Sequence, residues 1–507
     1  MTATHWLVLL LLIPLAASAL CAGSRLAGAG AGGARLAAAL HLASVSLLLA
    51  LSLAACVGVV SGGPLAALDG WLRVDALGAL FLALIGVLGF ATGLYAVGYM
   101  RHEREHGEVG PERLAGFYAL FQLFLFTMLL AVTANNVIMM WVAVEATTLG
   151  SAFLVGFYGQ RSSLEAAWKY MVICTVGVAF GLYGVVLVYS NAASLLGDHG
   201  GAAQWTTLLA MAHRLDPALT RIAFVFVLIG FGTKAGFFPM HAWLPDAHSE
   251  APSPISALLS AVLLNCALLI VIRFHMLAAR ALGPGFSETL LLVFGLMSVA
   301  VAALFILSQR HIKRLLAYSS VENMGLIAIA LGLGGPLGVM AALFHTVNHS
   351  LAKALLFCGS GNVLLKYGTP DMDSVKGLLR AAPLTAMLFG AGALALGGIP
   401  PFNVFYSEFL IVAAGFSQGH VALTVVVLLL LTIVLAGLAR MLAAILFGPA
   451  PDEVEPGEAG WLTLLPLILL MLAMLAIGLF MPDSLQTLLR EASQLVLAAA
   501  DHPVAIR

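Results

Sequence analysis

Long apolar runs recur along almost the whole 507-residue chain, and they limit its fold more than any other feature. Runs of about 18 or more apolar residues can span a bilayer as α-helices. The chain is 62% hydrophobic and 9% charged, whereas soluble domains carry roughly 25% charged residues. The sequence therefore predicts an all-α membrane protein with about fourteen transmembrane helices. The runs lie near residues 5–22, 36–60, 76–100, 114–133, 136–157, 166–190, 220–238, 254–279, 286–308, 314–334, 337–365, 383–416, 420–447 and 460–481.

Prolines interrupt two of the predicted helices. In the seventh, Lys234 lies in an apolar segment followed by Pro239. In the twelfth, the run 383–416 is too long for one straight span and is broken at Gly397-Gly-Ile-Pro-Pro401. Paired broken helices are typical of secondary transporters built from two repeats. The sequence predicts two five-helix repeats, which are inverted because an odd number of helices reverses the direction of the chain. The predicted segments are 1–113 (three helices), 114–279 (first repeat), 286–447 (second repeat) and 460–507 (last helix and amphipathic tail).

Two charged residues inside the apolar runs are the first candidates for function. Charges within a membrane are costly, and they mark ion paths more often than they mark packing. Glu145 lies deep in the fifth run and Lys234 in the seventh. A buried carboxylate needs a cation, so the two are predicted to form a pair. A switchable pair would release a proton from the lysine, because the charge of a buried lysine responds readily to its surroundings. A static ion pair is the structural alternative.

A stripe of titratable residues follows in the eleventh run. His345, His349 and Lys353 recur every four residues and so share one helix face. Three titratable groups in an apolar helix favour a proton relay over satisfied core histidines. A zinc site at the two histidines lacks an acid or a cysteine to complete it. Glu408, after the second break, ends the series.

Five further residues are secondary candidates for the same path. His241 and His248 lie in the first break. Glu322, in the tenth run, is either a relay carboxylate or a hydrogen-bonded structural acid. Lys169 begins the sixth run, where a snorkelling side chain is an equally good explanation. Asn265 lies in the eighth run and can hydrogen-bond but cannot titrate.

Cofactor motifs are absent from the sequence. There is no glycine-rich nucleotide loop, no Walker loop and no nucleophile triad. All five cysteines lie in apolar runs and never as CxxC, as expected of small buried hydrophobic residues. We expect neither a metal nor a redox cofactor in this chain, and the net charge of -1 suggests no nucleic-acid partner.

Basic residues are concentrated in alternate loops, by about two to one, which predicts that these loops face the cytoplasm. Both termini would then be periplasmic, in a bacterial inner membrane. The richer loops contain Arg25 and Arg35, then Arg101, Arg104 and Arg113, then Arg161, then Arg310, Lys313 and Arg314, then Lys366, Lys376 and Arg380. We expect the basic group at 310–314 to anchor its helix at the inner surface. The tail 483–500 is amphipathic and is expected on the membrane surface.

Four motifs carry a resemblance to a known family. They are Lys234 with Pro239-Met-His-Ala-Trp-Leu-Pro-Asp-Ala-His248 and Ala251-Pro-Ser-Pro254, then His311-Ile-Lys-Arg314 with Ala317-Tyr-Ser-Ser320, then His349-Ser-Leu-Ala-Lys-Ala-Leu-Leu-Phe357, and Gly398-Ile-Pro-Pro-Phe402. Over about residues 70 to 450 the chain resembles the antiporter-like subunits of respiratory complex I, Mrp-type sodium/proton antiporters and membrane-bound hydrogenases. Three segments look most like component F of hydrogenase-4, the formate hydrogenlyase type: Ala247-His-Ser-Glu-Ala-Pro-Ser-Pro254, Ser319-Ser-Val-Glu-Asn-Met-Gly325 and Phe357-Cys-Gly-Ser-Gly-Asn-Val363.

The resemblance implies fourteen spans and a central polar axis within the membrane. It implies that Glu145 and Lys234 are a coupled pair, that His349 and Lys353 are a central relay, and that Glu408 is a terminal proton site. The chain departs from the family in three places. Many relatives have a lysine where this chain has Asn265, many have a histidine near Asn323, and His311 replaces the usual acid of its motif.

The predicted function is that of a proton-translocating membrane subunit of a multi-subunit redox complex, which is not itself catalytic. Its partners would be other integral membrane subunits, the lipid bilayer and, indirectly, peripheral redox subunits of a hydrogenase or complex I type. A sodium/proton antiporter subunit and a structural membrane anchor are the alternatives.

Overall fold

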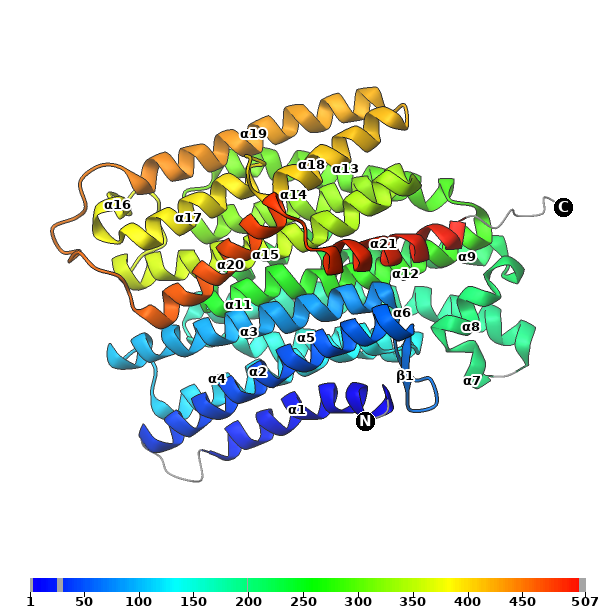
Figure 1. Cartoon of the computed structure of the whole chain (residues 1–507), viewed down its shortest axis with the longest axis horizontal. Coiled ribbons are helices and arrows are strands. Elements are labelled where there is room, and N and C mark those ends of the chain that lie inside the picture. Colours follow the sequence, from blue (N-terminus) through cyan, green and yellow to red (C-terminus); the bar gives the residue numbers. More distant parts are fainter. Residues whose placement is uncertain (1–2, 25–30, 198, 501–507) are drawn as a thin grey trace.

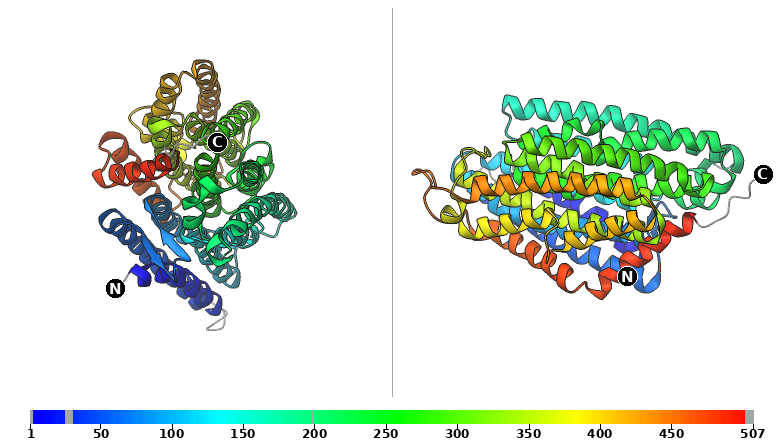
Figure 2. Two further views of the ribbon diagram at one scale, coloured as in Figure 1. Left: turned by 90° about the vertical axis from the view of Figure 1, so that its right-hand side faces the viewer. Right: turned by 90° about the horizontal axis from the view of Figure 1, so that it is seen from above.

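The structure is a computed structural model that describes residues 3–24, 31–197 and 199–500. Arg25, one of the basic loop residues, and the end of the tail lie outside these ranges. Helices lie side by side along the long axis of the molecule (Figure 1). Seen end-on, the N-terminal helices and α19 occupy opposite edges of the bundle (Figure 2). The prediction of an all-α membrane protein is confirmed.

Twelve helices in the described ranges are long and apolar enough to cross a membrane. They are α1 (Ala3–Gly23), α2 (Ala31–Gly62), α3 (Ala76–Glu105), α4 (Pro111–Thr133), α5 (Val137–Val155), α6 (Arg161–Leu196), α9 (Pro217–Ala235) continued by α10 (Trp243–Glu250), α11 (Ser253–Leu258) continued by α12 (Leu264–Leu282), α13 (Gly285–Ser308), α14 (Ile312–Leu333), α19 (Val421–Leu446) and α20 (Trp461–Leu479). The other two predicted runs correspond to α15 (Gly335–Tyr367) and to the shorter pair α17 (Pro383–Leu396) and α18 (Asn403–Ser417). The count of fourteen crossings stays a prediction, as do the four segments.

Both predicted helix breaks are present. Helix α9 ends at Ala235 because Gly236 takes a positive φ of 84° that stops the helix. The indole of Trp243, beyond the break, donates to the carbonyl of Thr233 at 2.9 Å and so satisfies one of the freed acceptors. A short 3₁₀ turn, η2 (Met240–Ala242), leads into α10. In the second break α17 ends at Leu396, and Gly398 has a φ of 69°.

The polar helices lie at the centre of the bundle. In the most apolar stretch of Ser253–Leu282 and of Ile312–Leu333, 100% of residues are buried, against 28% in His5–Gly23 and Val421–Leu446. Between α11 and α12 lies a π-helical turn, η3 (Leu259–Leu263), that the sequence does not predict. Such turns are frequent at functional sites. The outer helices therefore face lipid, while α12 and α14, which carry Asn265 and Glu322, are enclosed by protein.

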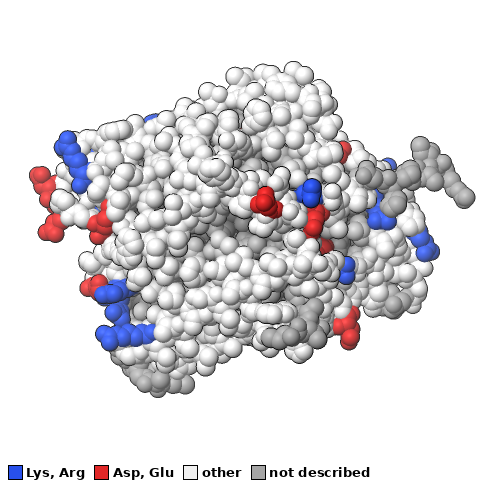
Figure 3. All heavy atoms as spheres, viewed as in Figure 1, with Lys and Arg blue, Asp and Glu red and all other residues white. Residues whose placement is uncertain are grey.

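Charged side chains lie at both ends of the molecule and in one group near the middle of the face shown, and a largely uncharged band separates that group from the left-hand end (Figure 3). Inside this band, small residues allow helix backbones to touch. A Cβ on Gly230 of α9 would clash with the backbone nitrogen of Gly181 on α6. Membrane helices use such glycines to pack closely. This contact fixes α6 against α9. All five cysteines are buried and free, as expected.

Several small elements lie at the ends of the bundle. A hairpin of β1 (Leu65–Ala67) and β2 (Leu72–Val74) and the short helices α7 (His199–Ala202), α8 (Trp205–Ala210), η1 (Ala212–Arg214) and α16 (Leu378–Ala381) are not predicted. The tail forms α21 (Asp483–Ala500), whose apolar face buries Leu488, Leu489 and Val496. That face packs on α3, α12 and α15. The expectation of a surface-lying tail is therefore wrong for this face, because the chain itself covers it.

Candidate functional site

Lys234 is fully buried at the end of α9, as the first break requires. Its ammonium donates to the hydroxyl of Tyr170 on α6 at 2.6 Å, and lies 4.5 Å from the centroid of that ring. The indole of Trp243 is also near, at 5.9 Å. The Tyr170 hydroxyl in turn hydrogen-bonds to Ser151 on α5 at 2.7 Å. The lysine is thus held by an aromatic ring and a neutral oxygen.

Glu145 is separate from this lysine. It is half-buried on α5, and it accepts a hydrogen bond from Thr175 of α6 at 2.8 Å. Its second carboxylate oxygen is buried and has no hydrogen-bond partner among the described residues. None of the ion pairs in the described part of the chain joins Glu145 to Lys234. The static ion pair is therefore wrong for this structure, which shows the two groups apart.

The second half of the chain contains an array of hydrogen-bonded polar groups that meet at Ser319. Lys353 of α15 is fully buried and donates to the hydroxyl of Ser319 on α14. One turn further on, the Asn323 amide donates to the Ser319 carbonyl at 2.7 Å and to the Glu322 carboxylate. The Asn323 oxygen faces Nε2 of His345 at 3.1 Å. The array thus joins a lysine, a carboxylate and an imidazole on two helices.

The same array continues to the second break. Nδ1 of His345 lies 2.9 Å from the hydroxyl of Ser407 on α18. Asn348 donates to that hydroxyl at 3.0 Å and accepts from Asn403 at 2.8 Å. Glu408, the predicted terminal site, is the next residue along α18 and is half-buried. Two of the six primary candidates, Lys353 and His345, therefore lie in the array, and Glu408 follows its last serine in the sequence.

Between the two halves the polar groups are incompletely bonded. Asn265 of α12 donates to Ser350 of α15 at 2.7 Å, but its oxygen has no partner among the described residues. Both ring nitrogens of His349 and of His248 are buried and equally unpartnered there. Buried polar atoms normally have hydrogen bonds to protein or water. These groups are consequently the places where internal water would bind.

Two secondary candidates lie away from the array. Lys169 is exposed and forms ion pairs with Glu165 at 2.7 Å and Asp246 at 3.4 Å. His241 is nearly buried, and its ring lies beside those of Phe238 and Tyr318. The structure brings neither into the hydrogen-bonded array, and the surface ion pairs suit a snorkelling Lys169.

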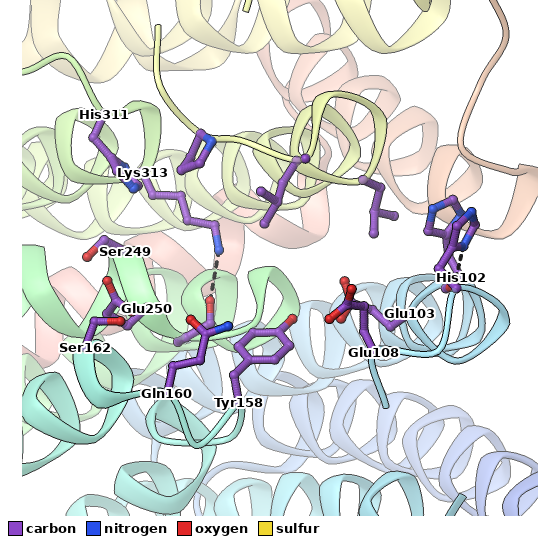
Figure 4. Close-up of a pocket in the computed structure, with 16 residues that line it drawn as sticks. His102, Glu103, Glu108, Tyr158, Gln160, Ser162, Ser249, Glu250, His311 and Lys313 are labelled. Carbon is purple, nitrogen blue, oxygen red and sulfur yellow. Dashed lines mark hydrogen bonds between the residues drawn. The ribbon is translucent and has the colours of Figure 1, made fainter. Parts of the chain in front are cut away.

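A cavity of about 550 Å³ opens at the end of the bundle where α3, α10 and α15 end and α4 and α14 begin. Figure 4 shows its side chains converging from opposite walls. Lys313 is only 2% exposed and donates to the carbonyl of Ala251 at 2.9 Å. The expected surface anchor is therefore wrong for Lys313, although Arg310 of the same group is exposed. The charged and imidazole residues of the wall are His102, Glu103, His106, Glu108, Glu250, His311 and Lys313.

His311 shows how the chain tolerates a departure from its motif. The residue precedes α14, and its Nδ1 accepts a hydrogen bond from the Arg314 backbone at 3.4 Å. An acid at this position would cap the helix in the same way. Burial, together with the nearby positive charges of Lys313 and Arg314, lowers the pKa of His311 to about 4. The imidazole is thus neutral at pH 7 and keeps the lone pair that capping needs.

The sequence does not predict four polar residues near the buried titratable groups, which are Tyr170, Ser407, Asn348 and Asn403. Hydroxyls and amides within apolar helices usually bond to their own backbone, so their presence carries little signal. Only Asn348 has a position in the sequence that indicates a role, because it lies between the two histidines of the stripe. In the described ranges no three His, Cys, Asp or Glu side chains converge to hold a metal ion.

An all-helical membrane bundle with two broken helices and buried titratable side chains defines the antiporter-like class of membrane protein. The chain belongs to the family of NADH:quinone oxidoreductase and Mrp antiporter membrane subunits, whose description "NADH:quinone oxidoreductase/Mrp antiporter, TM" applies to residues 134–435. Residues 67–107 match "NADH-Ubiquinone oxidoreductase (complex I), chain 5 N-terminus". The family resemblance carried by the four motifs is confirmed.

Individual relatives agree with this placement. The "Hydrogenase-4 component F homolog" of Methylacidiphilum infernorum is 39% identical over 412 residues, which are 81% of this chain and 85% of the relative. The structure of an archaeal membrane-bound sulfane sulfur reductase matches with a TM-score of 0.84 and 26% identity, covering 97% of both chains. The Mrp complex of Dietzia sp. matches in fold, with a TM-score of 0.84 and 22% identity over 99% of this chain and 98% of that one. These relatives are subunits of multi-subunit membrane complexes.

Proposed function

We propose that the chain is the proton-translocating subunit of a membrane-bound redox complex of the hydrogenase-4 type. The observation that carries this proposal is the buried array from Lys353 through Asn323 and His345 to Ser407, beside Glu408. A packed core has no need of a fully buried lysine and histidine linked by hydrogen bonds, because each charge is costly in lipid. Such an array is suited to passing protons. The likeness to a hydrogenase-4 component supports the choice of complex.

The proposed path has two parts. In the first, Glu145 and Lys234 form a pair that opens and closes, and the separate bonds of Lys234 to Tyr170 and of Glu145 to Thr175 support an open arrangement. In the second, protons move along the array to Glu408. His349 and water held near Asn265 join the two parts, because the amide itself cannot titrate. Of the secondary candidates, Glu322 belongs to this path through its bond to Asn323.

The cavity supplies the mouth of this path. It lies at the face where the richer basic loops are, so we assign it to the cytoplasmic side and both termini to the periplasm of the inner membrane. Glu103, Glu108 and Glu250 on its wall would attract cations. Lys313 lies at the wall next to Ala251, and His248 lies one turn of α10 deeper. Protons collected here would reach Lys353 through these two side chains.

Peripheral redox subunits would supply the energy, because we assign no redox chemistry to this chain. The test uses the whole complex in sealed vesicles with a pH-sensitive dye. Lys353→Ala is expected to keep substrate oxidation but to lose proton pumping. Lys366→Ala, on the same helix but at its surface end, is the matched control and should pump normally. Normal pumping by Lys353→Ala would overturn the proposal and favour a structural membrane anchor.

A sodium/proton antiporter subunit of the Mrp type is the second candidate. The fold match to the Mrp complex over 99% of this chain favours it. The same vesicles separate the two functions. Under this alternative, ion exchange would need sodium and a proton gradient but no redox substrate. Under the proposed function, removal of the redox substrate abolishes proton movement whether or not sodium is present.

A further inference from the structure

The hydrogen bonds around His345 have two complete arrangements that differ by one proton. The orientation of Asn323 is settled by the Ser319 backbone carbonyl, which can only accept and which the Asn323 amide nitrogen faces at 2.7 Å. Its oxygen must then face Nε2 of His345, which carries a hydrogen. One nitrogen of the imidazole is thus always a donor, and only Nδ1 is free to change.

The opposite side of the ring is settled in the same way. Asn348 donates to the backbone carbonyl of Asn403 at 2.9 Å and accepts from the Asn403 side chain at 2.8 Å. Its remaining hydrogen points to the Ser407 hydroxyl at 3.0 Å. The hydroxyl therefore has one filled lone pair, one free lone pair and one hydrogen to place.

The Ser407 hydrogen has two acceptors within reach. They are Nδ1 of His345 and the carbonyl of Val404, both at 2.9 Å. When the imidazole is neutral, the hydroxyl donates to Nδ1. When the imidazole holds two hydrogens, Nδ1 donates to the free lone pair of Ser407, and the hydroxyl hydrogen turns to Val404. Each state satisfies both His345 nitrogens, the Ser407 hydroxyl and the Asn348 amide, and no heavy atom has to move.

We infer that Ser407 is a positioning residue whose rotating hydroxyl lets His345 take up and release a proton in place. This inference rests on the proposed function and assigns its second half a specific step. Three further features fit it. Ser407, His345 and Asn348 are all 0% exposed, so water does not compete for these bonds. Ser407 lies near the start of α18, the helix after the second break, and adjoins Glu408. A group in its place that could only donate or only accept would hold His345 in one protonation state and so stop the relay.

The test compares substitutions of Ser407 in the assembled complex. Ser407→Ala removes the hydroxyl, and the loss of a hydrogen bond to a charged group shifts an equilibrium by roughly tenfold or more. We expect pumping per substrate oxidised to fall by about that factor. Ser407→Thr should restore pumping, because a helical threonine hydroxyl reaches the same backbone carbonyl. Ser407→Cys, with similar volume but a weak donor, should lie between the two.

Ser417→Ala is the matched control. Ser417 lies on the same helix and makes the same bond to the carbonyl three residues before it, but it is exposed and has no histidine partner. It should leave pumping unchanged. Normal pumping by Ser407→Ala, or equal loss in the alanine, cysteine and threonine variants, would overturn the role of the hydroxyl. His345→Gln distinguishes failure of the Ser407 inference from failure of the proposed function. If His345→Gln also pumps normally, His345 is not part of the proton path and the proposed function fails there as well.

Discussion

Tyr170→Phe removes a single oxygen from beneath Lys234. The hydroxyl is the neutral acceptor at 2.6 Å, while the ring at 4.5 Å stays in the variant and keeps its attraction for the cation. A hydrogen bond from a charged group contributes about 1.5–3 kcal/mol. The ring contributes roughly 0.5–2 kcal/mol, which the substitution leaves in place. In the variant, Lys234 should therefore lose the hydrogen bond that fixes its position but keep its attraction to the aromatic ring.

The lost bond changes where the lysine lies. A free-energy change of about 1.5–3 kcal/mol alters a conformational ratio roughly 10- to 150-fold. Glu145 and Cys174 are the other titratable neighbours close enough to act on the Lys234 charge. Glu145 has a buried carboxyl oxygen without a hydrogen-bond partner among the described residues, so it can accept from the ammonium. We expect the lysine of the variant to move onto Glu145 and to stay there.

Two measurements check this expectation. A cryo-electron microscopy map of the variant complex should place the Lys234 nitrogen within about 4 Å of a Glu145 oxygen, the usual limit for an ion pair. Pumping in vesicles should fall about tenfold, because a trapped lysine no longer alternates between partners. Tyr183→Phe is the control, since Tyr183 is on the same helix and 51% exposed. A lysine that stays over the phenyl ring of the variant, with normal pumping, refutes the reasoning.

Three further substitutions test the packing and the caps. Asp75→Asn breaks a buried ion pair with Arg273 at 3.0 Å, and should destabilise the fold by about 3–5 kcal/mol in thermal unfolding. Burial alone would raise the pKa of Asp75, but the Arg273 guanidinium outweighs it and holds the pKa below its ordinary value. The wild-type stabilisation is therefore complete above the unfolded pKa and is lost as pH falls through the folded one, a loss that the variant should not show. Gly230→Ala forces a Cβ against the backbone of Gly181, and this overpacking should destabilise the fold by about 1–3 kcal/mol in the same assay. Glu458→Ala removes a carboxylate that caps the start of α17 and should cost about 0.5–2 kcal/mol there.

Matched controls exist for the last two. Gly62→Ala adds a methyl group where nothing lies within 4 Å, so it should leave unfolding unchanged. Glu455→Ala removes an exposed acid from the same loop as Glu458. If either control changed the free energy of unfolding as much as its partner variant does, the effect would come from the change of residue type and not from the loss or gain of the named contact.

The sequence predicts which charged residues are buried better than it predicts which residues bind them. A lysine or histidine in an apolar run is conspicuous, and Lys234, His345 and Lys353 are indeed fully buried. Their partners are mostly neutral and are supplied by other helices. Tyr170 lies 64 residues from the lysine that it holds. Nothing local in the sequence distinguishes it from a tyrosine that faces lipid, such as Tyr183 on the same helix.

Lys313 illustrates the limit at a helix end. A basic residue in the first turn of a membrane helix snorkels outward if lipid surrounds it. The same residue turns inward if neighbouring helices enclose it and offer an acceptor. Here the break before Pro252 leaves the Ala251 carbonyl without a backbone donor among the described residues, and the Lys313 ammonium and the Ser256 hydroxyl donate to it. The sequence shows both the lysine and the proline, but their proximity depends on how α10 packs against α14.

The two buried lysines are held in different ways, and this difference locates the step that couples the halves of the chain. Lys353 donates to the hydroxyl of Ser319, and the carbonyl of that residue accepts from Asn323, which bonds to Glu322 and His345, so titratable groups lie close to this lysine. Lys234 binds Tyr170, whose other bond leads through Ser151 to a backbone carbonyl of α5 and ends there. A carbonyl takes no proton, so this branch can hold Lys234 but cannot conduct. The lysine must move for its half to pass a proton on, and Asn265 of α12, the helix packed against α9, has a buried oxygen without a partner among the described residues. An amide there can orient water but cannot store charge, so transfer between the halves has to follow the motion of Lys234 and cannot precede it.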